Sequence, residues 1–220
     1  MILVAFENEN MRSQAVCLWQ EAFGDSEEYI NFFFANHSCF CLTECENEDL
    51  CSMLFLIEGE LNNIKGYYLF AACTFEKYRK KGYMPRLLKK AEAYAKEQGR
   101  GFIALVPAEE WLFDYYEKYG YNLMFYAQRA EPEKEIDINR DRCFKWCKAH
   151  EEYIRAESKK FGFEITEKNG MLFTVYSDGK IKIPADKVNE DNKFGMLLPV
   201  APTTLDVFAD NAYIGLTLDG

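Results

Sequence analysis

Residues 67–98 constrain the fold more than any other stretch, because an apolar run, a basic turn and a helical pattern follow one another directly. The run "YYLFAACT" (67–74) is almost wholly apolar, which is typical of a central strand covered on both faces. Residues 85–98 begin with a proline, which suits the first turn of a helix, and they repeat leucine and alanine on one face. The chain must therefore lead a buried strand through a tight turn into a helix.

The turn between them gathers positive charge in a chain whose formal net charge is -10. Arg79, Lys80 and Lys81 precede Gly82 there, beside the unpaired backbone N–H groups of the helix start. A strand, a glycine turn and a helix N-terminus together favour an anion site, so we expect a ligand that carries phosphate. The alternative is a solvated basic surface. The phosphate motifs G-x-x-x-x-G-K-S/T and G-x-G-x-x-G are not present in the sequence.

Hydrophobic periodicity and turn residues predict the other elements, and their order indicates an α/β (α+β) fold class. We expect helices over 11–22, from Asp25 or Ser26 to Asn36, over 109–120 and over 141–161, and strands over Cys39–Glu44, Met53–Glu60, 102–106, Tyr121–Tyr126, Met171–Tyr176, Lys180–Ile183, Met196–Leu198 and Tyr213–Leu218. A hairpin turn is expected at Asp178-Gly179. The polar stretch 129–142 predicts a boundary between a domain of residues 1–130 and a C-terminal region of residues 131–220.

Composition argues against several classes of function. A pI near 4.9 disfavours nucleic acid as a partner, since phosphate backbones need a broad basic face. No run approaches the roughly 20 apolar residues of a membrane span, and the start of the chain resembles no signal peptide. We therefore expect a soluble, cytoplasmic protein with no membrane partner. The eight cysteines are expected to be reduced thiols without a metal, because zinc-ligand spacing is missing, and Cys143 and Cys147 are expected on the helix 141–161.

Two separate motifs resemble the GCN5-related N-acetyltransferase (GNAT) family. The run "RKKGYM" (79–84) is similar to the family signature of Gln or Arg, two residues, Gly, one residue, then Gly or Ala, with Met84 in place of the small residue. In "YEKYGY" (116–121), Tyr116 stands four residues before Gly120, as in the family pattern Y-x-x-x-G-F/Y. The resemblance covers residues 1–127. The opening segment and the additional C-terminal region also resemble the bacterial subgroup typified by enhanced-intracellular-survival aminoglycoside acetyltransferases.

The resemblance implies a fold in which a mixed, mostly antiparallel sheet is flanked by helices, with a smaller C-terminal α+β region covering the acceptor groove. It implies acetyl-CoA as co-substrate, bound by Ala72, Cys73 and Thr74 on the strand end and by Arg79, Lys80, Lys81, Gly82, Tyr83 and Met84 in the turn. It implies that a primary amine, carried by a small molecule or a peptide, attacks the thioester directly. Tyr116, whose phenol has a pKa near 10, would protonate the departing thiolate. A homodimer is a further expectation.

The acceptor site is less determined by the sequence. We expect Glu28, Phe33 and Trp111 to contact the acceptor, whereas several groups remain open as general base: Glu27, Glu28, Glu109, Glu110, Asp114, a water chain or the carboxylate of Gly220. Three alternatives stay open. Tyr116 can be a core aromatic, Cys73 can be a covalent nucleophile, and the protein can be a non-catalytic acyl-CoA-binding module.

Overall fold

The structure is a computed structural model, and it describes residues 8–133, 143–185, 188–201 and 214. The strand predicted over Tyr213–Leu218 and the candidate base at Gly220 therefore fall outside the described residues, apart from Ile214. The described helices are α1 (Glu9–Phe23), α2 (Glu27–Asn36), α3 (Tyr83–Glu97), α4 (Trp111–Glu117) and α5 (Lys148–Phe161). The described strands are β1 (Phe40–Glu46), β2 (Asp49–Leu61), β3 (Ile64–Thr74), β4 (Phe102–Leu105), β5 (Asn122–Ala130), β6 (Lys145–Trp146), β7 (Glu164–Lys168), β8 (Met171–Val175), β9 (Ile181–Pro184) and β10 (Lys193–Pro199).

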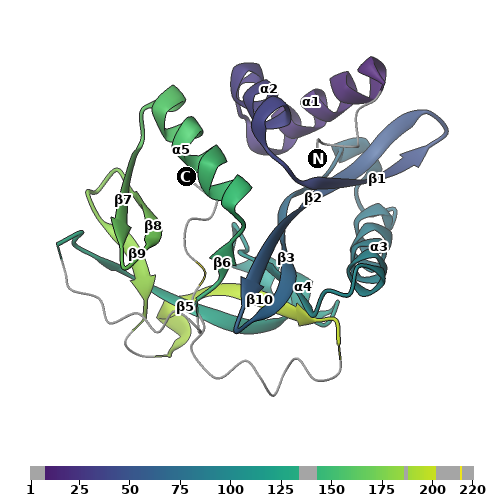
Figure 1. Ribbon diagram of the computed structural model, residues 1–220. Helices are drawn as coiled ribbons and strands as arrows, with labels where there is room; N and C mark the ends of the chain where they lie inside the picture. The colour runs from purple at the N-terminus through teal and green to yellow at the C-terminus, as the bar shows by residue number, and fades with distance from the viewer. Residues whose placement is uncertain (1–7, 134–142, 186–187, 202–213, 215–220) are drawn as a thin grey trace.

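A single large sheet forms the centre of the molecule (Figure 1). Its strand order is β1-β2-β3-β4-β10-β5-β9, and β6 adds to β2. β3 and β4 pair in parallel, whereas each of the other described pairs is antiparallel. The predicted mixed, mostly antiparallel sheet flanked by helices is therefore confirmed.

Two hydrophobic layers cover the two faces of this sheet. Along β2, Phe55 and Ile57 belong to the layer under α1, α2 and α5, and Leu54 and Leu56 belong to the layer under α3 and α4. This alternation follows from the two-residue period of a strand. All four side chains have no exposed surface, so β2 is buried on both faces. The same arrangement explains why β3 is apolar along its length.

The last described strand, β10, lies between β4 and β5 in the central sheet. Met196 of β10 pairs with Leu105 on one side and with Leu123 on the other. The predicted division at residue 130 therefore cuts through one sheet. Residues 131–192 form an insertion between β5 and β10; its described parts include α5 and the hairpin of β7 and β8, while its β6 and β9 join the central sheet.

One prediction within this insertion is wrong, and another holds only in part. The helix predicted over 141–161 begins only at Lys148, because Phe144 and Trp146 before it pack on the central sheet, where the Phe144 ring fills the space above Gly59. Cys143 is therefore buried outside the helix, and Cys147 is the residue before its first turn. The predicted turn at Asp178-Gly179 forms, with φ of 77° at Gly179 and a hydrogen bond from the Tyr176 N–H to the carbonyl oxygen of Lys180, but the strands beyond it pair with other strands: β8 with β7 and β9 with β5. The strand β7 was not predicted.

Candidate functional site

The strands β3 and β4 separate at the centre of the sheet. Their pairing ends at Tyr68 opposite Ala104, although β3 continues to Thr74. Beyond that point β3 contains an irregularity opposite β2, and Ala71 has φ of 48°. A side chain rarely adopts this left-handed conformation, and such strain is often found at functional sites. The edge of β3 that faces away from β2 is thus left open to a ligand beside the end of β4.

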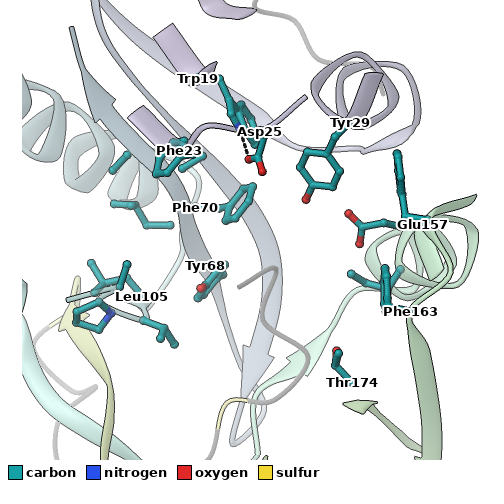
Figure 2. A pocket seen from close by; sticks show the side chains of 18 of the residues that line it. Trp19, Phe23, Asp25, Tyr29, Tyr68, Phe70, Leu105, Glu157, Phe163 and Thr174 are labelled. Carbon is teal, nitrogen blue, oxygen red and sulfur yellow. Dashed lines mark hydrogen bonds between the residues drawn. The ribbon is translucent and has the colours of Figure 1, made fainter. Parts of the chain in front are cut away.

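A cavity of about 780 Å³ occupies the opening between these strands. Its wall includes the edge of β3 from Tyr68 to Ala72 and the end of β4 with the residues that follow it, Leu105 to Ala108. A second part of the wall comes from α1 and α2, and another part comes from α5 and β8 of the insertion (Figure 2). A volume of several hundred Å³ is typical of a small-molecule site.

Tyr116 of α4 lines this cavity. Its side chain is 8% exposed, and its ring packs edge-on against Tyr115 and Tyr121. Among the described residues, no group forms a hydrogen bond with the Tyr116 hydroxyl, which leaves this donor available to a ligand. Burial, together with the nearby Cys73 thiol, raises the pKa of Tyr116 above its ordinary value of 10. The phenol is therefore protonated at neutral pH.

The predicted basic turn lies at the end of β3 that points away from the insertion. Lys80 has φ of 62° and Gly82 has φ of 82°, and α3 begins at the next residue. No side chain caps this helix start, so its first N–H groups remain available to an anion. The Arg79 Nε donates to the carbonyl oxygen of Thr74 at 3.1 Å, which holds the turn against the end of β3.

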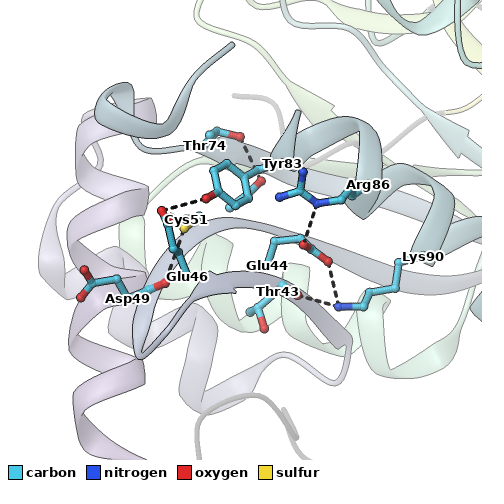
Figure 3. Close-up of polar contacts among 10 residues, drawn as sticks. Thr43, Glu44, Glu46, Asp49, Cys51, Thr74, Tyr83, Arg86 and Lys90 are labelled. Atoms are coloured by element: carbon cyan, nitrogen blue, oxygen red, sulfur yellow. Dashed lines mark hydrogen bonds and ion pairs between the residues drawn. The ribbon is translucent and has the colours of Figure 1, made fainter. Parts of the chain in front are cut away.

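The basic residues of this region divide into two groups. Arg86 and Lys90 of α3 both form ion pairs with Glu44 of β1, and Lys90 also donates to the carbonyl oxygen of Thr43 (Figure 3). These two attach α3 to the sheet. The other group has no carboxylate partner in the part of the chain that the structure describes; it consists of Lys77, Arg79, Lys80 and Lys81. Its charge is therefore uncompensated.

The side chains of Tyr83 and Met84 point away from this anion site. The Tyr83 hydroxyl donates to Glu46 Oε2 at 2.9 Å, and its ring is buried against Tyr78 and the neighbouring Cys51 (Figure 3). Met84 packs against the apolar layer under α3 and α4. These two residues can therefore contribute their backbone N–H groups to the helix start. The Met84 side chain, which replaces the small residue of the family pattern, does not occupy the turn.

The predicted strand residues Ala72, Cys73 and Thr74 have different surroundings. Ala72 lines the cavity. The Ser52 hydroxyl donates to the carbonyl oxygen of Cys73 at 2.8 Å and lies 2.9 Å from Thr74 Oγ1. Burial raises the pKa of the Cys73 thiol well above its ordinary value of 9, so the thiol stays protonated and is a poor nucleophile.

The three residues predicted to contact the acceptor do not line the cavity. Glu28 is exposed on α2 and forms an ion pair with Lys160. Phe33 is fully buried in the hydrophobic layer between the sheet and helices α1 and α2. Trp111 is 59% exposed, and its indole N–H donates to Glu109. Nor do the other candidate bases of the described chain line the cavity; these are Glu27, Glu109, Glu110 and Asp114.

Two other carboxylates line the cavity instead. Asp25 follows Gly24, which ends α1 with φ of 77°, and its Oδ2 accepts from the Trp19 indole at 2.7 Å. Glu157 of α5 is 4% exposed and accepts from the Tyr153 hydroxyl at 2.8 Å. The sequence signals neither of them, because they are acidic residues in segments rich in charge.

Glu157 points toward the hydroxyl of Tyr29 across the cavity (Figure 2). Burial raises the pKa of Glu157, and nearby Asp25 adds to this effect, whereas hydrogen bonds from the Tyr153 and Tyr29 hydroxyls oppose it. The same burial and the neighbouring Glu157 raise the pKa of Tyr29. At this end of the cavity, the Glu157 carboxyl group therefore meets two neutral hydroxyl donors.

The described residues contain no cluster of three or more His, Cys, Asp or Glu side chains arranged to hold a metal ion. None of their helices is both long enough and apolar enough to span a membrane.

The profile of the acetyltransferase (GNAT) domain family matches residues 5–124, which is more than half of the chain. A comparison with curated proteins gives no match. Among solved structures, the chain is similar to a GCN5-related N-acetyltransferase from Kribbella flavida, with a TM-score of 0.55 and 10% identity over 88% of this chain and 70% of that one. This likeness supports the fold described above.

Two other similar structures have lower scores. Eis1 from Mycobacterium abscessus has a TM-score of 0.47 and 12% identity over 61% of this chain and 37% of that one. The PaiA N-acetyltransferase from Thermoplasma acidophilum, solved in complex with coenzyme A, has a TM-score of 0.39 and 19% identity over 50% of this chain and 83% of that one. The chain spans between 32% and 37% of the length of several structures that it matches.

Proposed function

Because the chain belongs to the GNAT acetyltransferase family, we propose that it transfers an acetyl group from acetyl-CoA to a primary amine of a small molecule or peptide. The observation that carries this proposal is the free hydroxyl of Tyr116, which lines a cavity at the point where β3 and β4 separate. A donor placed there can meet the sulfur of a thioester that enters between the two strands.

The basic turn supplies the proposed site for the CoA pyrophosphate. The N–H groups at the start of α3 and the positive end of its dipole favour an anion. Arg79, Lys80 and Lys81 add charge that no described carboxylate neutralises. The pantetheine arm would follow the unpaired edge of β3 past Ala72 toward the cavity, because backbone groups left open on a strand edge accept extended ligands.

Tyr116 is proposed as the general acid of the reaction. The acceptor amine attacks the thioester carbonyl directly, the carbon–sulfur bond breaks, and the hydroxyl proton of Tyr116 passes to the departing thiolate. The proton that the attacking nitrogen loses as the amide forms returns the Tyr116 phenolate to its neutral form. The raised pKa of Tyr116 keeps this proton in place across the neutral range. The buried and protonated Cys73 thiol argues against a covalent acetyl-enzyme.

Two measurements on the purified chain test this proposal. Calorimetry with acetyl-CoA should show binding to one site, and thiol release should then follow when primary amines are added. Binding without turnover by any amine would favour the alternative of a non-catalytic acyl-CoA-binding module. Absence of acetyl-CoA binding by the folded chain would contradict the proposal as a whole.

A further inference from the structure

The two ends of the cavity differ in chemistry. One end holds Tyr116 and the end of β4, where the thioester would react. Glu157 lies on the opposite side of the cavity from Leu105 of β4, and the rings of Tyr68 and Phe70 lie between them (Figure 2). An acceptor that reaches both ends must therefore pass over an aromatic surface.

The far end carries two carboxyl groups, and no cationic side chain of the described wall accompanies them. Asp25 and Glu157 both line it, and among the described residues of the cavity wall there is no lysine, arginine or histidine. The donors that these carboxylates have among the described residues are neutral: the Trp19 indole for Asp25, and the Tyr153 and Tyr29 hydroxyls for Glu157. A buried carboxylate with only neutral donors is costly to ionise, and a cationic ligand group removes that cost.

The wall between the two ends is apolar and aromatic. Tyr68 and Phe70 of β3 face Phe163 of the insertion across this part of the cavity (Figure 2). Aromatic faces favour flat or aliphatic groups and also attract cations. This surface suits a hydrocarbon spacer better than a polyhydroxylated one.

From these observations, and resting on the proposed acetyl transfer, we propose that the acceptor is a diamine-type molecule: a reacting primary amine at the Tyr116 end, an apolar spacer, and a second cationic group bound by Glu157 with Asp25. Glu157 is then a specificity-determining residue supplied by the insertion. Because the reacting amine has to lie at the thioester, the group at Glu157 must be a different part of the acceptor.

Matched acceptors test the proposal on the full chain. Benzylamine and 4-(aminomethyl)benzylamine share one reacting group and one ring, and differ by a second cation. We expect the diamine to bind the CoA-loaded protein about 10- to 100-fold more tightly in calorimetry, which is the usual range for one charge-assisted contact. If acetyl transfer is measured, kcat/KM should show the same preference.

Glu157→Gln should remove that preference. The amide keeps an oxygen that accepts from Tyr153, so the diamine should fall to the affinity of the monoamine while the monoamine changes by less than about 3-fold. Because burial raises the folded-state pKa of Glu157, its protonated carboxyl group stabilises the folded protein in acid, and this contribution is lost as pH rises through the folded-state pKa. The Gln variant should therefore melt at the parent temperature or above it at pH 7, whereas a purely structural Glu157 would leave it less stable.

Glu152→Gln on the same helix is the control, because Glu152 is exposed and paired with Lys148 away from the cavity. It should leave the diamine preference intact. Equal affinity of the parent protein for the two acceptors would overturn the inference, as would a Glu157→Gln variant that keeps the preference. Neither result touches the proposed acetyl transfer, which depends on acetyl-CoA binding and on turnover of any primary amine.

Discussion

The basic turn at 79–84 and the acidic end of the cavity are opposite in almost every respect. The turn is contiguous in sequence, exposed and positive, and it acts mainly through backbone N–H groups. The acidic end brings together α1, α2, β3 and α5, and it acts through the side chains of Asp25 and Glu157. This acidic chain therefore separates its charges in space: the positive side chains lie where a phosphate is expected, and the acidic side chains lie where an amine is expected.

Tyr116 lines the same cavity as Asp25 and Glu157, and loss of its hydroxyl should have the largest effect. Tyr116→Phe keeps the ring and its contacts with Tyr115 and Tyr121 while it removes the hydroxyl. We expect kcat to fall by roughly 10²–10³-fold, the usual scale for a positioned general acid, with acetyl-CoA affinity unchanged. Steady-state thiol release and calorimetry measure the two quantities.

The pH profile sharpens this test. Because the pKa of Tyr116 is raised above 10, the parent enzyme should show no loss of rate from this group up to about pH 10. A variant that turns over at the parent rate would mean that Tyr116 is a core aromatic and that another group or water supplies the proton.

Replacement of Arg79, Lys80 and Lys81 together by Ala should have the next largest effect, and it acts on the turn alone. These side chains are exposed, so solvent screens them, and we expect acetyl-CoA affinity to fall by about 10- to 100-fold rather than by the full sum of three buried contacts. Lys89→Ala, an exposed lysine of α3, is the control and should change affinity little. Unchanged affinity in the folded triple variant would leave the turn as a solvated surface.

The attachment of α3 should matter for stability more than for binding. Glu44→Gln weakens the ion pairs with Arg86 and Lys90, which are half exposed, so the free energy of unfolding should fall by about 1 kcal/mol at pH 7. Burial would raise the pKa of Glu44, but the hydrogen bonds and charges of Lys90 and Arg86 outweigh it and lower the pKa below 4.5. The stabilisation is therefore present above pH 4.5 and is lost as pH falls through the lower folded-state value.

Denaturant unfolding of parent and variant at pH 7 and in acid measures this difference. The gap between the two should close in acid, and acetyl-CoA affinity should change by less than about 3-fold. A large loss of affinity would show that the position of the turn depends on this ion-pair cluster.

Cys73→Ala should have the smallest effect on activity. The thiol is buried and protonated, so kcat should stay within about 2-fold of the parent, while a small cavity costs about 1 kcal/mol of stability. Thiol release after a rapid mix of enzyme and acetyl-CoA, without amine, provides the second measurement. A burst of free CoA in the parent protein that is absent in the variant would instead support a covalent acetyl-enzyme at Cys73.

The same contrast explains what the sequence predicted. The end of α1 at Gly24, the start of α2 after Ser26 and the turn before α3 depend on local backbone chemistry, and all three are found where local signals place them. The acceptor end depends on how distant segments pack. Tyr29 and Phe33 lie one turn apart on α2, yet Tyr29 lines the cavity and Phe33 is fully buried in the hydrophobic core.

Glu157 could not have been predicted for a related reason. Its helix also carries Glu151 and Glu152, and only the packing of α5 against the aromatic residues of α2 turns Glu157 inward. The helix start at Lys148 was missed because Phe144 and Trp146 fit a helical pattern as well as they fit the sheet that buries them. In both cases the structure depends on side-chain burial against residues distant in sequence, which local propensity does not encode.

The place of β10 between β4 and β5 means that the central sheet can be completed only late in synthesis. β4 and β5 leave the ribosome before residues 131–192 have been made, at roughly 5–20 residues per second. Until β10 follows, the two edges that it joins have no strand between them, and unpaired edges invite association with other chains. The nascent chain therefore contains the described residues of its cavity wall before β10, the last described strand, joins β4 to β5.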